Sequence, residues 1–102
     1  MSPPGNGQPI RYHVSMSGHV KGVLQQLHQQ ARAAGRSKRF LAAVRQVIER
    51  LHEEPLNLGE PLYRLPALEL LVFQAVVDFL VVDFSVHQAR PEVFIRGFKL
   101  LG

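Results

Sequence analysis

The fold is decided by residues 68–86, which read LELLVFQAVVDFLVVDFSV. Valine, leucine and phenylalanine dominate this stretch, as they do in β-strands. Asp78 interrupts it and predicts a turn, which divides the stretch into one strand from Leu68 to Val77 and another from Phe79 to Val86. A third strand-like run extends from residue 92 to residue 101. Together the three runs predict an antiparallel meander.

Upstream of the meander, residues 10–17 alternate between apolar and polar side chains. The apolar members are Ile10, Tyr12, Val14 and Met16, and they fall on one face of an extended chain. This period of two predicts a first strand with one buried face.

Between these strands the apolar period lengthens to that of amphipathic helices. Apolar residues recur every three or four positions from about residue 19, and the Ser17 hydroxyl can cap the first turn. Gly35 suits the left-handed conformation that ends many helices. A second stripe runs from Ser37, a predicted cap, to Pro55, whose ring and missing N–H stop a helix. Because the connection at 35–37 is short, the helices should pack as an antiparallel hairpin.

Three prolines and one glycine punctuate residues 55–67, and we interpret this segment as irregular. The predicted element order is therefore β-α-α-β-β-β. This order predicts an α/β (α+β) fold in which a helical hairpin packs on one face of a mostly antiparallel sheet.

The last hairpin predicts a second apolar face. With residues 87–90 as the loop, Val86 would lie opposite Pro91, and Phe84 would pair with Val93 in the core. The face away from the helices would then carry Phe79, Val81, Phe94 and Phe98. Because soluble monomers rarely expose a large apolar patch, we expect a partner chain or self-association to cover this face.

Length and composition favour one small domain. The chain has 102 residues, of which 46% are hydrophobic, and no cysteine. We expect residues 1–9 to be a flexible lead-in and residues 10–102 to form a single domain. No apolar run approaches the ~20 residues of a membrane span, and we expect a cytoplasmic protein. The five histidines show no metal-ligand spacing, so we expect neither a metal nor a cofactor.

Positive charge is concentrated in the first half of the chain. Residues 1–50 hold eight Lys or Arg and one acidic residue, whereas residues 51–102 hold four and seven. The densest cluster lies at the predicted helix turn and comprises Arg32, Arg36, Lys38 and Arg39. Such a cluster can bind phosphate or an acidic partner surface, and it can equally be a solvated turn.

The element order and the connector resemble a known family. A strand containing Arg11-Tyr12-His13-Val14-Ser15 is followed by a helical hairpin and then by Leu58-Gly59-Glu60-Pro61-Leu62 before the meander. This arrangement, over residues 10–101, resembles the RelE/ParE toxins of bacterial toxin–antitoxin systems. The resemblance implies a small basic domain bound by an antitoxin. It also implies one of two targets, because RelE-type members cut messenger RNA on the ribosome and ParE-type members bind DNA gyrase.

RNA cleavage requires an acid, a base and cations that stabilise the phosphate. The resemblance implies Lys and Arg on the second and third strands and Arg with Tyr or His near the end of the chain. Here the second strand carries Glu69 and the third carries Asp83. The cations that remain as candidate catalytic residues are Arg64, Arg96 and Lys99.

Three functions follow from these observations. The first is a toxin-like protein that acts mainly by binding an antitoxin, with gyrase or the ribosome as candidate targets. The second is a ribosome-dependent mRNA endoribonuclease that uses the three candidate cations. The third is a non-toxic interaction module that keeps the fold.

Overall fold

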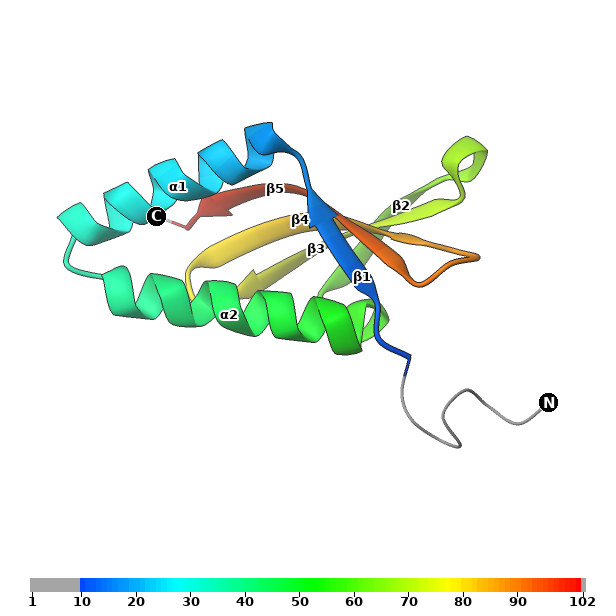
Figure 1. The fold of residues 1–102 in the computed structure, drawn as a ribbon, viewed down its shortest axis with the longest axis horizontal. Coiled ribbons are helices and arrows are strands. Elements are labelled where there is room, and N and C mark those ends of the chain that lie inside the picture. The colour runs from blue at the N-terminus through cyan, green and yellow to red at the C-terminus, as the bar shows by residue number, and fades with distance from the viewer. Residues whose placement is uncertain (1–9, 102) are drawn as a thin grey trace.

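The computed structural model describes residues 10–101, so the predicted flexible lead-in at 1–9 lies outside the described residues. Two helices and five strands make up the fold (Figure 1). In chain order they are β1 (His13–Met16), α1 (Gly18–Ala33), α2 (Ser37–Glu53), β2 (Glu60–Leu65), β3 (Leu70–Val77), β4 (Leu80–His87) and β5 (Glu92–Leu100). Short 3-10 turns at Pro55–Asn57 and Pro66–Leu68 flank β2.

The strands form one mixed sheet in the order β1-β5-β4-β3-β2. β1 pairs with β5 in parallel, and every other pair is antiparallel. Both helices lie on the same side of the sheet, so the other side, called here the helix-free face, has no helix over it (Figure 1). The predicted α+β class and helical hairpin are therefore confirmed. None of the helices within residues 10–101 is long and apolar enough to cross a membrane.

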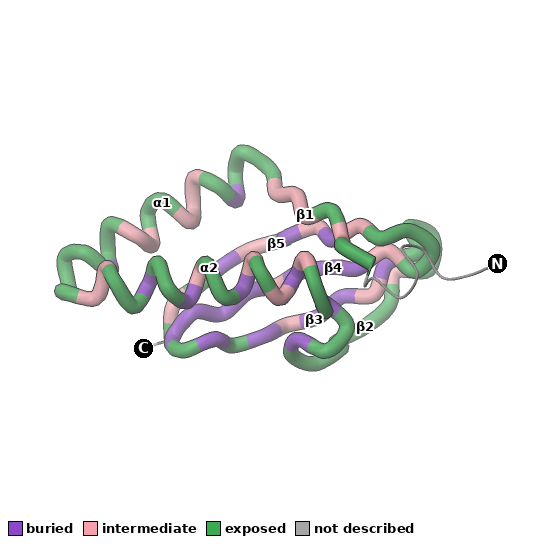
Figure 2. Tube along the Cα trace, turned by 60° about the horizontal axis from the view of Figure 1, so that its bottom comes forward, coloured by how far each residue is buried: buried purple, intermediate pink, exposed green. Residues whose placement is uncertain are grey.

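The core lies between the helices and the sheet. Its strand residues are the inward-facing positions of β3, β4 and β5, and buried positions follow these three strands in Figure 2. From α2 come Phe40, Ala43, Val47 and Leu51, which are spaced by three or four residues. α1 buries only Val20 and Ala31, so most of its surface faces solvent.

β2 corrects the prediction that residues 55–67 are irregular. Pro61 is the second residue of β2, and Pro66 follows its last residue. The side chains of β2 are exposed on both faces, so the strand lacks the alternation of apolar and polar residues by which a strand is recognised. Gly59 precedes it with a φ of +77°. A Cβ at Gly59 would lie 2.2 Å from the Gln74 carbonyl oxygen, so glycine is required for the chain to pass this close to β3.

Two of the three predicted helix-terminal residues have the predicted role, and one does not. Ser17 caps α1 through its hydroxyl, which accepts from the Val20 N–H at 3.2 Å, and Gly35 adopts a left-handed φ of +72°. Ser37, predicted to cap α2, is instead its first residue. Its hydroxyl lies 3.0 Å from the His28 Nε2 on α1 and so joins the two helices.

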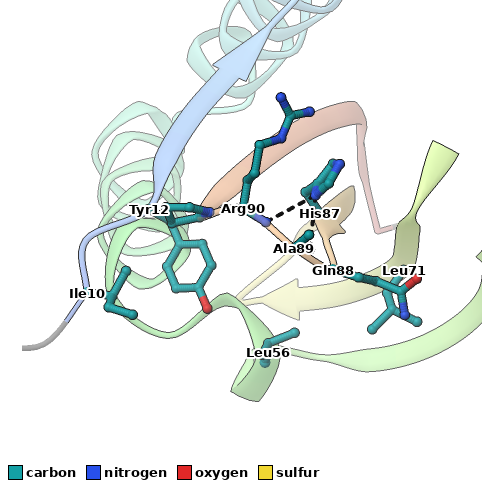
Figure 3. Close-up of a pocket in the computed structure, with 9 residues that line it drawn as sticks. Ile10, Tyr12, Leu56, Leu71, His87, Gln88, Ala89 and Arg90 are labelled. Carbon is teal, nitrogen blue, oxygen red and sulfur yellow. Dashed lines mark hydrogen bonds between the residues drawn. The ribbon is translucent and has the colours of Figure 1, made fainter. Parts of the chain in front are cut away.

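The predicted pairing of β4 with β5 is wrong by two residues. Val86 lies opposite Val93 and Phe84 opposite Ile95, so the turn is longer than four residues. The His87 ring accounts for the extra length. Its Nδ1 accepts from the backbone N–H groups of Ala89 and Arg90 at 3.0 and 3.1 Å and holds the turn open (Figure 3).

A bulge in β5 changes which side chains enter the core. Asp83 pairs with Gly97 and Phe84 with Ile95, which leaves Arg96 as the extra residue. Beyond the bulge the faces exchange, so Phe98 points into the core instead of away from the helices.

β1 is shorter than predicted. Tyr12, Val14 and Met16 pack against the core as expected, but Ile10 lies before the strand and is exposed. The Tyr12 backbone is anchored to the end of α2, because its N–H donates to the His52 carbonyl at 2.8 Å and its carbonyl lies 2.7 Å from the His52 Nδ1.

We predict that Gly59→Ala destabilises the fold by about 3–5 kcal/mol, since it adds backbone strain to a clash with β3. Gly35→Ala is the matched control. Gly35 has a similar φ, but no atom lies within 4 Å of the position that its Cβ would take. Gly35→Ala should therefore lower the free energy of unfolding by about 1–2 kcal/mol. Chemical denaturation of both variants checks the difference, and equal losses would contradict the role of the close approach.

Candidate functional site

The helix-free face is organised in rows that cross the strands. One row contains Tyr63, Val72, Ser85 and Phe94, as the strand register shows. Val72 and Ser85 are buried in the middle of this row, while Tyr63 at its edge is 50% exposed. The Ser85 hydroxyl has no hydrogen-bond partner among residues 10–101, so this row is effectively apolar.

A polar groove lies beside this row. It has a volume of about 450 Å³ and is lined by Leu62, Tyr63, Val72, Gln74, Asp83 and Arg96. The Gln74 side-chain amide donates to the Asp83 carboxylate at 2.8 Å. Asp83 is half-buried, and within residues 10–101 no cation lies within ion-pair distance of it. The groove thus presents a carboxylate that Gln74 orients, together with the Arg96 guanidinium, which does not contact it.

Only part of the predicted partner-facing surface lies on the helix-free face. Phe79 and Phe98 belong to the core, and Val81 is buried in the sheet, so these three do not form an exposed patch. Phe94 remains half-buried on the helix-free face. The exposed apolar residues there are Leu62, Tyr63 and Val76, and the first two were missed because β2 was not recognised as a strand.

The three candidate catalytic cations are not brought together. Arg64 pairs with Leu71 and therefore projects from the helix-covered face, whereas Arg96 lines the groove on the other face. They also sit on strands three positions apart, a separation of about 14 Å at the usual strand spacing. Lys99 is exposed near the end of β5, opposite Val81. This geometry does not form a clamp around one phosphate.

A second groove, of about 320 Å³, lies at the turn between β4 and β5 (Figure 3). Tyr12, Leu56 and Leu71 give it a largely apolar lining on one side, and residues 87–91 close the other. His87 is its only titratable imidazole, and its Nδ1 is already occupied by the two backbone N–H groups of the turn. His87 therefore has a structural role in this groove.

The basic cluster forms the tip of the helical hairpin, called here the hairpin tip and defined as Arg32, Arg36, Lys38 and Arg39. Arg39 forms a bidentate ion pair with the Asp78 carboxylate. Its Nη2 donates to Oδ1 at 2.5 Å, and its Nε donates to Oδ2 at 3.1 Å. The Arg36 guanidinium carbon lies 4.5 Å above the centre of the Phe79 ring. These contacts join the hairpin tip to the turn between β3 and β4.

The same contacts shift two pKa values. The hydrogen bond to Asp78 raises the pKa of Arg39, and the charge of Asp78 adds to this effect. The hydrogen bond from Arg39 is the largest effect and lowers the pKa of Asp78. Desolvation is the next largest and opposes it, and the charges of Arg39 and Arg36 lower the pKa further. Asp78 also adopts a left-handed φ of 57°, which aspartate tolerates better than most residues.

No three histidine or acidic side chains within residues 10–101 converge to hold a metal ion.

Comparisons with known proteins identify the fold. No protein-family model matches the chain, and no curated protein sequence matches it. The structure is similar to a chain of the toxin–antitoxin complex RelBE2 from Mycobacterium tuberculosis, with a TM-score of 0.65 and 20% sequence identity. The match covers 91% of this chain and 94% of that chain. The protein therefore has a RelE-like fold, as the resemblance in its sequence implied.

We predict that Asp78→Asn lowers the stability of the fold at neutral pH, because it removes the carboxylate that forms the ion pair with Arg39. Asparagine also tolerates the left-handed backbone, so the turn should persist. Since the folded-state pKa of Asp78 is lowered, its stabilisation is present above the unfolded pKa and is lost as pH falls through the folded pKa. Thermal midpoints of variant and parent should therefore converge as the pH falls through the lowered pKa of Asp78. A difference that does not change with pH would contradict this account.

Proposed function

We propose that this chain is the toxin-type member of a toxin–antitoxin pair and that it acts by binding protein instead of cutting RNA. The RelE-like fold supports the first part, because the similar chain comes from a toxin–antitoxin complex. The helix-free face supports the second part, because the chemistry of its groove differs from that of a nuclease.

The observation that carries the proposal is the Asp83–Gln74 pair in the middle of the groove. A nuclease site there would need cations facing the phosphodiester, and a carboxylate repels it instead. Arg96 and Lys99 are the candidate cations on this face and offer no base, and Arg64 lies on the opposite face.

The same residues suit a protein segment. Leu62 and Tyr63 form an exposed apolar rim on β2, which is an edge strand of the sheet. A partner side chain carrying a positive charge can pair with Asp83 while its apolar neighbours cover the rim. We assign this role to the antitoxin, which would cover the helix-free face. Gyrase and the ribosome are then the candidate cellular targets.

We predict that induced expression in a bacterial host arrests growth while the 5′ ends of translated messages stay as they are in uninduced cells. Asp83→Asn should weaken binding of the cognate antitoxin by at least about tenfold, because it removes a half-buried charge that a cation pairs with. Glu49→Gln on α2 changes the charge equally, lies outside the groove and should bind like the parent.

Two results would overturn this function. New 5′ ends in translated messages that disappear in Arg96→Ala would show an RNA-cutting enzyme. Normal growth of the host, together with no loss of binding in Asp83→Asn, would leave an interaction module that keeps the fold without toxicity.

A further inference from the structure

The hairpin tip carries an excess of positive charge that the proposed function does not use. Four cations lie here, and the fold brings one acidic residue, Asp78, to this end of the molecule, where it pairs with Arg39. The other acidic residues within 10–101 lie later in α2, at the opposite end of the sheet or in the helix-free groove. The excess charge at the tip is therefore not cancelled by its surroundings.

Two of the four cations are held in place before any ligand arrives. Asp78 fixes the Arg39 guanidinium through two hydrogen bonds, and the Phe79 ring lies beneath both Arg36 and Arg39 at 4.5 and 5.3 Å. Stacking on a ring holds a guanidinium without using its N–H donors, so those of Arg36 remain available. A side chain that is already ordered loses less entropy when it binds.

The chemistry of the tip favours phosphate over a protein surface. Residues 32–39 contain no large hydrophobic residue, because Ala33, Ala34 and Gly35 fill the turn, and the exposed apolar residue beside them is the single Leu41 on α2. Protein interfaces depend on clusters of aromatic or aliphatic anchors, and a single leucine beside four cations does not form such a cluster. The Phe79 ring is buried beneath the arginines, so it cannot stack on an unpaired base as single-strand sites require.

We propose that the hairpin tip binds the phosphate backbone of double-stranded nucleic acid without reading its sequence. Arg32 and Lys38 contact phosphates as exposed, adaptable cations, and Arg36 presents its guanidinium stacked on Phe79. This surface is separate from the helix-free groove, and its activity does not depend on the proposed function.

The test uses the full chain and two labelled probes of mixed sequence, an RNA stem and a DNA duplex of equal length. Fluorescence anisotropy is measured from 50 to 200 mM salt. The parent protein should bind at low salt, with an affinity that falls linearly on a logarithmic plot by about 0.9 per phosphate contact on DNA. The double variant Arg32→Ala/Lys38→Ala should bind at least about tenfold more weakly and reduce that slope by about 2.

The matched control is Lys21→Ala/Arg45→Ala, which removes two exposed cations from the same two helices away from the tip. It should keep the affinity and the slope of the parent, and circular dichroism should show both double variants folded. If both double variants lost affinity for the probes equally, net charge alone would attract the protein to nucleic acid, and the proposal would be overturned. Absence of binding by the parent at 50 mM salt would also overturn it. Binding to one probe only would support it and identify whether the backbone is RNA or DNA.

Discussion

The close approach of Gly59 to β3 is the constraint on which the site depends. A side chain at this position would collide with the Gln74 carbonyl, so only glycine lets the chain leave α2 and pair at once with β3. That pairing creates β2 and with it the exposed Leu62 and Tyr63. Without β2 the sheet would end at β3, and the polar groove would lose one wall. A single backbone contact thus connects the proline-containing connector to the surface that we assign to the partner.

The groove is the basis of our proposal that this RelE-like fold binds protein. Its most defined interaction is a hydrogen bond from the Gln74 amide to the Asp83 carboxylate, which orients a negative charge toward the open face. A carboxylate in this position favours a cationic side chain and disfavours a phosphodiester. The cations that the molecule does present in a group lie on the hairpin tip. The fold therefore separates the groove, which carries one carboxylate and one guanidinium, from the positively charged hairpin tip.

Local patterns were sufficient to predict most of the fold. The apolar periods of residues 19–53, the Ser17 cap and the Gly35 stop define the hairpin, and β-branched residues define β3 and β4. β2 could not be predicted because an edge strand exposed on both faces carries no alternating pattern. The pairing of β4 with β5 depends on a ring nitrogen of His87 that accepts two backbone N–H groups, and the bulge at Arg96 then redirects Phe98. The His87 hydrogen bonds and the bulge at Arg96 depend on tertiary structure, and neither produces a periodic pattern in the sequence. The groove could be anticipated only in part, since Asp83 and Arg96 stood out by charge while Tyr63 depended on the unrecognised strand.

The central claim is that the helix-free face binds protein. The most direct measurement places a photo-crosslinking p-benzoylphenylalanine at Tyr63, which is 50% exposed on that face, or at Leu41, which is 44% exposed on α2. Each variant is expressed in bacteria with the cognate antitoxin, irradiated and analysed by mass spectrometry. We expect a discrete antitoxin adduct at position 63 and none at position 41. An RNA adduct at position 63, or equal antitoxin adducts at both positions, would contradict the account.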